Sequence, residues 1–300
     1  MKAFPFLAII CLAGNGWSQT SEGFRISVDV NLVVLHPTVR DGKGQFASDL
    51  RAQDFEVYED GVRQTIQLFR HEDIPVTVGL LVDHSSSMGH KLEEVVAAAR
   101  TFVHSSSPED QMFVVNFNEK VMLGLPNAGF SDNSVELERA MFRMPAQGMT
   151  ALYDAVLRGQ AQLQAGSRDK KVLIVISDGG DNASTHSLSQ VLEIAERSSA
   201  LIYTIGIFDQ EDEDKNPDVL RRLARATGGD AFFPDKPKEV VAVCERIARD
   251  IRHQYTLGYV SSNVAKTAGY RSIRVVARSA GNSKLVVRTR AGYIAAKAEE

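Results

Sequence analysis

The sequence predicts an α/β fold with a doubly wound, mostly parallel sheet, inserted into a smaller β-sandwich that both ends of the chain build together. Between residues 76 and 254, apolar strand-like runs alternate with amphipathic helical stretches, which is the pattern of a parallel sheet covered by helices. Most of these runs lack polar alternation, so both of their faces are expected to be buried. The flanking segments instead show the period-two alternation typical of antiparallel strands.

Length and composition set the first limits. The chain has 300 residues, of which 44% are hydrophobic, and this is enough to bury the core of one large domain or two modest ones. The formal net charge is −4. The sequence has neither a Lys/Arg-rich run nor an aromatic platform for stacking bases, so a nucleic acid is not expected as a partner.

The N-terminus has the features of a secretory signal peptide covering residues 1–18. Lys2 provides the positive start, an apolar run follows at 3–13, and residues 16–18 form a small-x-small cleavage site. The mature chain is expected to begin near Gln19 and to be secreted or periplasmic. An uncleaved anchor is the alternative, although the apolar run is shorter than the ~20 residues of a membrane span, and no span is expected after cleavage.

Cysteine usage is sparse. Cys11 lies in the predicted signal and is not expected to be lipidated, because Ile10 stands where a lipoprotein signal carries a small residue. Cys244 is then the only cysteine of the mature chain, so no intramolecular disulfide can form. Its apolar neighbours at helical spacing predict a buried, unreactive thiol.

The first flank covers residues 24–72. Residues 26–35 show period-two character, and the stretch "FEVYEDGVRQTIQLF" contains two alternating runs joined through Asp60 and Gly61, a hairpin signal. The second flank, 255–296, contains further short strands in "YTLGYV", "YRSIRVVAR" and "KLVVRTRAGYI", with a turn at 280–282. About fifty residues are marginal for an independent domain. The two flanks are therefore expected to pair with each other around an inserted domain at 75–254.

The inserted domain has clear strand and helix candidates. The expected strands are Val76–Val82, Met112–Phe117, Val172–Ile176, Leu201–Phe208 and Ala231–Phe233. The expected helices are Lys91–Ser105, Val135–Met144, Ala151–Gln164, Leu188–Ser198, Pro217–Ala226 and Lys238–His253. Ser187 and Pro217 provide helix starts, and Gly228 and Gly229 provide a helix end.

The stretch "VGLLVDHSSSMG" places oxygen-bearing side chains directly after a buried strand. Ligands of an open parallel sheet gather beyond the carboxyl ends of its strands, and Asp83 stands at such an end. Asp83, Ser85 and Ser87 are spaced at i, i+2 and i+4. In an extended loop this spacing points all three side chains the same way.

Two later loops are expected at the same edge of the sheet. The strand in "KVLIVISDGGD" ends at Asp178, and Thr150 stands just before a predicted helix. Two carboxylates and three hydroxyls suit Mg²⁺, with Mn²⁺ or Ca²⁺ possible, rather than Zn²⁺. Such a set would leave one metal position open for a partner's carboxylate. The alternative is that these residues only cap turns.

Five residues carry a family resemblance. The "DHSSS" and "SDGGD" stretches together with Thr150 resemble the metal-ion-dependent adhesion site of von Willebrand factor type A domains, in which Asp83, Ser85, Ser87, Thr150 and Asp178 match the five signature positions. The order of segments from about residue 24 to 294 resembles bacterial secreted proteins related to this family. The resemblance implies a non-enzymatic, adhesion-type module that binds a protein partner. It also implies Mg²⁺ held directly by the three hydroxyls, with the two carboxylates bound directly or through water.

Other polar residues give weaker signals. The acidic run 209–218 should lie on the metal-bearing face and is more typical of a solvated loop than of a Ca²⁺ site, because its spacing is not that of an EF-hand. Asp154 and Asp181 either brace the site or lie on the surface. His84 and His90 are expected at the surface or behind the site, since their spacing supports neither a Ser-His pair nor an i, i+4 metal pair.

Two other functions remain open. A phosphoryl-transfer enzyme of the haloacid-dehalogenase kind also places an aspartate after an apolar strand, but that family has a further acid where this chain has Ser85. An envelope scaffold with an incidental metal site is the second alternative. The sequence identifies neither the partner nor the oligomeric state.

Overall fold

A six-stranded sheet forms the centre of the inserted domain in the computed structural model, which describes residues 32–71, 73–208, 214–236, 239–263, 268–279 and 285–295. Its strand order is β11-β10-β9-β6-β7-β8, and all neighbours are parallel except β8, which runs antiparallel to β7. The strands are β6 (Val76–Asp83), β7 (Gln111–Phe117), β8 (Val121–Leu123), β9 (Lys170–Ser177), β10 (Leu201–Gly206) and β11 (Ala231–Phe232). The predicted fold class is therefore confirmed.

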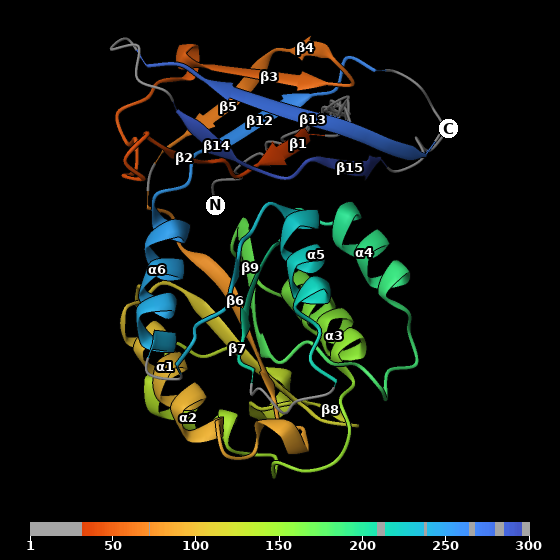
Figure 1. Cartoon of the computed structure of the whole chain (residues 1–300). Helices are drawn as coiled ribbons and strands as arrows, with labels where there is room; N and C mark the ends of the chain where they lie inside the picture. The colour runs from red at the N-terminus through yellow and green to blue at the C-terminus, as the bar shows by residue number, and fades with distance from the viewer. Residues whose placement is uncertain are drawn as a thin grey trace, which may run out of the picture. The chain divides into compact units, whose positions relative to one another are not determined.

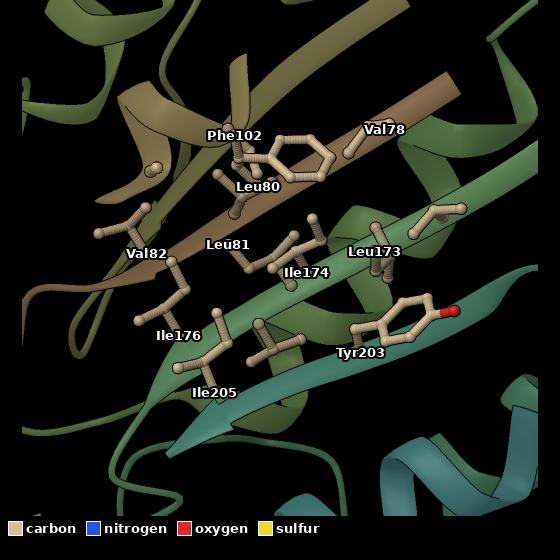
Figure 2. Packing of buried hydrophobic residues seen from close by; sticks show 14 of the residues in the cluster. Val78, Leu80, Leu81, Val82, Phe102, Leu173, Ile174, Ile176, Tyr203 and Ile205 are labelled. Carbon is tan, nitrogen blue, oxygen red and sulfur yellow. The ribbon is translucent and has the colours of Figure 1, made fainter. Parts of the chain in front are cut away.

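The central strands are apolar because helices cover both faces of the sheet. All eight residues of β6 are buried, and Figure 2 shows its apolar side chains beside those of β9 and, on the far side of β9, those of β10, including Leu81, Ile174 and Ile205. Gly79 lies within β6, where a Cβ atom would collide with the ring of Phe113. The strand can pack this closely only because residue 79 has no side chain.

The helices that the described residues place on this sheet are α1 (Leu92–His104), α2 (Ser134–Met141), α3 (Leu152–Gln164), α4 (Leu188–Arg197), α5 (Pro217–Thr227) and α6 (Val240–Arg252). Figure 1 shows α1, α2 and α6 on one face and α3, α4 and α5 on the other. Short 3₁₀ turns occupy Ala52–Asp54, Ser86–Met88 and Pro126–Ala128. Every predicted helix is present, which follows from the periodic apolar positions that each contributes to the core.

Helix ends follow local chemistry. Ser187 caps α4 by accepting a hydrogen bond from the Gln190 amide, and Gly228 ends α5 in a left-handed conformation with φ of 87°. The α2 helix was predicted to reach Met144 but ends at Met141. Pro145 follows, and a residue before proline is disfavoured in helical conformation.

In the described parts of both chain ends, strands pair into smaller antiparallel sheets. Their orders are β1-β12-β5, β15-β13-β3-β4 and β14-β2. The strands are β1 (Leu32–Leu35), β2 (Thr38–Arg40), β3 (Phe55–Glu59), β4 (Val62–Gln64), β5 (Ile66–Arg70), β12 (Thr256–Val260), β13 (Gly269–Ala277), β14 (Val286–Arg288) and β15 (Gly292–Ala295). Phe55 and Val57 share one core with Tyr255, Leu257 and Ile273. The predicted pairing of the two flanks is therefore present in the sheets.

The hairpin at residues 60–61 is confirmed, but the run after it was misread. Asp60 and Gly61 have φ of 47° and 81°, the backbone of a type I′ turn, and β3 pairs with β4 across them. The second run is not one strand: β4 stays beside β3, whereas β5 pairs with β12 in another sheet. The sequence has no glycine or proline between β4 and β5, so no turn signal reveals the change of sheet.

Several predictions fall on residues outside the described ranges. These are the signal peptide 1–18, the first residues of the N-terminal flank, residue 238 and the turn at 280–282. The domain boundaries therefore remain predictions. Within the described ranges, no helix has the length and apolar character that crossing a membrane requires. Cys244 is buried in α6 as expected, and burial raises the pKa of its thiol to about 12.

Candidate metal centre

Two parallel strand ends form the base of the candidate site. β6 and β9 are hydrogen-bonded neighbours with Val82 opposite Ile176, so the residues that follow them emerge side by side. Asp83 is the last residue of β6, and Asp178 comes directly after β9. The chain then turns into the 3₁₀ segment Ser86–Met88, which keeps the serines close to the strand end.

Four of the five predicted residues come together here. The hydroxyl of Ser87 donates to Asp178 Oδ2 at 2.5 Å, and the Ser85 and Ser87 hydroxyls are 3.1 Å apart. Ser85 and Asp178 are both 2% exposed, and Asp83 is fully buried. The result is a compact cluster of hydroxyl and carboxylate oxygens drawn from two separate loops.

Asp83 is the most buried member of the cluster. Its Oδ1 accepts from the Ser85 amide at 2.8 Å, and its Oδ2 accepts from the Ser177 hydroxyl at 2.6 Å. Burial, together with the negative charge of Asp178, raises the pKa of Asp83 to about 7 although the hydrogen bonds oppose this rise. Ser177 was not predicted as part of the site; its only signal is its position as the last residue of β9.

Thr150 reaches the same rim through its backbone. It is 5% exposed and stands two residues before the first residue of α3. Among the described residues, its hydroxyl makes no hydrogen bond with the other four candidates. Its loop is tied to theirs, however, because the Gly148 carbonyl accepts from both the amide and the hydroxyl of Ser86 at 3.1 Å.

Asp154 and Asp181 form hydrogen bonds with the loop between β9 and α4 and with the start of α3, and not with the Thr150 hydroxyl. Asp154 accepts from the amide and hydroxyl of Thr185 at 3.0 Å and from both the amide and Nδ1 of His186. Asp181 accepts from the Tyr153 amide at 3.1 Å and from the Ser184 hydroxyl at 2.6 Å. Both carboxylates therefore hold the loop between β9 and α4 against the start of α3.

Of the two positions predicted for His84, the structure shows the one behind the site and not the one at the surface. This residue is fully buried, with Nε2 3.1 Å from Asn116 Oδ1, and burial lowers the pKa of its imidazole. It points away from the oxygen cluster into the structure between β7 and α2, since Asn116 in turn bonds the Ala140 carbonyl. His90 is exposed as expected.

Only part of the acidic run is described, because residues 209–213 lie outside the described ranges. Asp214 accepts from the Asn182 side-chain amide at 3.3 Å. Asp218 belongs to the first turn of α5, where it pairs with Arg221 at 2.8 Å. The described end of the run therefore lies beside the β9–α4 loop.

The donor set fits a hard divalent cation. Every side-chain polar atom offered by the five candidates is an oxygen, and a cation bound beside the two buried carboxyl groups would favour their charged forms. Among the residues that the structure describes, no three His, Cys, Asp or Glu side chains gather as a metal-binding group. A divalent ion bound here would therefore take most of its protein ligands from hydroxyls, as in sites that suit Mg²⁺ better than Zn²⁺.

Comparison with known proteins gives a consistent result. The profile of the von Willebrand factor type A domain matches residues 77–243. A curated relative, "Uncharacterized protein sll0103" of Synechocystis sp., is 26% identical over 174 residues, which are 56% of this chain and 40% of the relative. The chain thus spans about two fifths of the length of that relative.

Two solved structures share the fold. A von Willebrand factor type A protein from Catenulispora acidiphila has a TM-score of 0.53 at 14% identity, covering 85% of this chain and 71% of that one. Proximal thread matrix protein 1 from the mussel byssus, with a zinc-occupied MIDAS motif, has a TM-score of 0.52 at 14% identity, covering 64% and 49%. At this identity the likeness concerns the fold alone.

Proposed function

Because this chain belongs to the von Willebrand factor type A domain family, whose profile matches more than half of it, we propose that it is a secreted, non-enzymatic protein-binding module with a metal-dependent adhesion site. Ser85, Ser87 and Thr150 would hold Mg²⁺ through their hydroxyls. Asp83 and Asp178 would bind it directly or through water. Mn²⁺ or Ca²⁺ could occupy the same oxygen ligands.

The strongest support for a metal site is the contact between two loops. The Ser87 hydroxyl and the Asp178 carboxylate lie 2.5 Å apart although 91 residues separate them. The Ser85 hydroxyl contacts that of Ser87, and the Asp83 carboxyl accepts a hydrogen bond from the Ser85 amide. Turn capping alone would not require hydroxyls and carboxylates from different loops to converge at the carboxyl end of a parallel sheet.

The ligand types suggest how the site would bind a partner. Three neutral hydroxyls leave more positive charge on a divalent ion than a cage of carboxylates would, so the ion remains attractive to an incoming anion. The chemistry that such an ion supplies is a coordination position for a carboxylate oxygen. A partner's Asp or Glu side chain would complete it. The zinc-occupied motif of proximal thread matrix protein 1 supports a divalent ion in this fold.

Calorimetric titration with MgCl₂ tests the metal site. The wild-type chain should bind one Mg²⁺ per molecule, and both Asp83→Ala and Ser87→Ala should weaken binding at least about ten-fold, because each removes an oxygen ligand. Asp132→Ala, which removes an exposed carboxyl near the start of β7, is the matched control and should bind as wild type does. Circular dichroism establishes that each variant is folded. Absence of Mg²⁺ binding by the folded wild type would refute the site.

Partner capture tests the adhesion role. Proteins retained on the immobilised wild-type chain in Mg²⁺ should be released by a chelator and should not be retained by Ser87→Ala. Retention that survives both Thr150→Ala and Asp178→Ala would instead favour an envelope scaffold whose β-sandwich makes the contacts. Hydrolysis of p-nitrophenyl phosphate that disappears in Asp83→Asn would favour a phosphoryl-transfer enzyme.

A further inference from the structure

Two side chains outside the candidate ligand set hold the peptide groups around Thr150. Glu119 Oε2 accepts from the Met149 amide at 3.1 Å, and Asn182 Oδ1 accepts from the Thr150 amide at 2.8 Å. Glu119 follows β7 and Asn182 follows β9. The consecutive backbone amides of Met149 and Thr150 are therefore fixed by side chains from two different loops. These amides adjoin the Thr150 side chain, which is the candidate metal ligand.

The residue before Met149 is shaped for this contact. Gly148 has φ of 79°, a conformation that residues with a side chain rarely adopt. A Cβ atom there would collide with the carboxylate of Glu119. Glycine thus allows Glu119 to lie directly over the loop, where it can reach the next amide.

The carbonyl side of Thr150 is held as well. Its oxygen accepts from the amides of Asn182 and Ala183, both at 3.0 Å, so Asn182 bonds Thr150 through its side chain and its main chain. The Ala151 amide donates to the Asn118 carbonyl at 2.8 Å. Every hydrogen bond in this set crosses between loops, and none of them depends on the Thr150 hydroxyl.

We propose that Glu119 and Asn182 are positioning residues that fix the Thr150 hydroxyl where the metal site needs it; this rests on the metal site proposed above. A ligand must be held within about 0.5 Å of its productive position. A loop residue achieves this only if its backbone is fixed, and outer partners of metal ligands typically contribute about 10–100-fold to metal affinity. Glu119 is exposed, so its removal should change the loop and not the fold.

The experiment compares paired variants in two measurements. Glu119→Ala and Asn182→Ala should each weaken Mg²⁺ binding about ten-fold by calorimetry, whereas Glu119→Gln should restore it, because its side-chain carbonyl can still accept from the Met149 amide. In the metal-free protein, amide hydrogen exchange measured by NMR should accelerate at Met149 in Glu119→Ala and at Thr150 in Asn182→Ala. Glu109→Ala, an exposed acid in the turn before β7, is the control and should change neither measurement.

The outcomes separate this proposal from the one it rests on. If the wild type binds Mg²⁺ and both alanine variants bind it equally well, the positioning role is wrong while the metal site stands. If Glu119→Gln behaves like Glu119→Ala, the carboxylate acts through its charge and the positioning role is again wrong. Unchanged amide exchange in the alanine variants contradicts it without reference to metal. A folded wild type that binds no divalent ion removes the metal site, and the role assigned to Glu119 and Asn182 goes with it.

Discussion

At the residue scale, burial governs the charge of His36. Its imidazole is 6% exposed, and burial, with the positive charges of Lys170 and Arg290, lowers its pKa to about 3. Its Nδ1 lies 3.3 Å from the Thr256 hydroxyl. An unfolded chain would have an ordinary histidine with a pKa near 6.5. The folded state therefore resists a proton that the unfolded state accepts between these two values.

This difference predicts acid sensitivity. The stability linked to His36 is fully present above pH 6.5 and is lost as the pH falls towards 3, because only the unfolded state binds the proton in that window. Below pH 6, the free energy of unfolding of the wild type, measured in urea, should fall with each pH unit by about 1.4 kcal/mol more than that of His36→Asn. His104→Asn, at the exposed end of α1, should follow the wild type. Parallel slopes for the wild type and His36→Asn would contradict the assignment.

At the element scale, α3 begins without a cap of its own. Its N-cap residue is Ala151, which has no side chain able to accept a hydrogen bond. Asp181, which lies in another loop, supplies the missing cap by accepting a hydrogen bond from the Tyr153 amide at 3.1 Å. A carboxylate at a helix start also interacts favourably with the helix dipole. The start of α3, and with it the loop that carries Thr150, thus depends on the β9–α4 segment.

Removing this borrowed cap should destabilise the fold. Asp181→Ala is expected to lower the free energy of unfolding by about 1 kcal/mol, the usual effect of losing a capping side chain. Asp218→Ala is the comparison, since Asp218 also lies in a first helical turn but is exposed and pairs with Arg221 at the helix surface, and it should change stability by less. Chemical denaturation measures both. Equal effects would mean that Asp181 does not act as the cap of α3.

At the scale of the whole described chain, a buried carboxylate joins α6 to the β14–β2 sheet. Asp250 is fully buried and accepts from Arg40 at 2.5 Å and from Arg288 at 2.7 Å. Arg288 also pairs with Asp230. These contacts connect segments up to 210 residues apart in the sequence. The paired flanks and the inserted domain are therefore linked by charge as well as by chain connectivity.

Breaking this cluster should be costly. Asp250→Ala leaves two guanidinium groups without their buried partner, and we expect a loss of about 3 kcal/mol, the lower end for a buried pair, because both arginines remain one quarter exposed. Asp169→Ala, which removes an exposed acid paired with Arg70 at 3.7 Å, should cost less than about 1 kcal/mol. Urea denaturation at pH 7 compares them. A loss below 1 kcal/mol for Asp250→Ala would show that the cluster contributes little to stability.

The sequence by itself determined the features that depend on neighbours along the chain. The largely apolar runs within β6 and β9 predicted a buried parallel sheet, Ser187 and Gly228 marked helix ends, and Asp60 with Gly61 marked a hairpin. Asp83, Ser85 and Ser87 were predicted as ligands because a strand end followed by spaced oxygens is a local pattern, and the family resemblance supported the choice of Thr150 and of Asp178, the matching strand-end residue. Such features are legible because periodicity and backbone preference act over a few residues.

Only the tertiary structure decided which distant side chains meet. Ser177 donates a hydrogen bond to Asp83, and Glu119 and Asn182 accept hydrogen bonds from the Thr150 loop. These bonds join residues 30 to 94 positions apart. Burial of His84 and the separation of β4 from β5 into different sheets were likewise invisible in the sequence. These contacts depend on strand order and loop paths, which fix where a side chain lies in space and how far from water it sits. No spacing rule along the chain encodes that information.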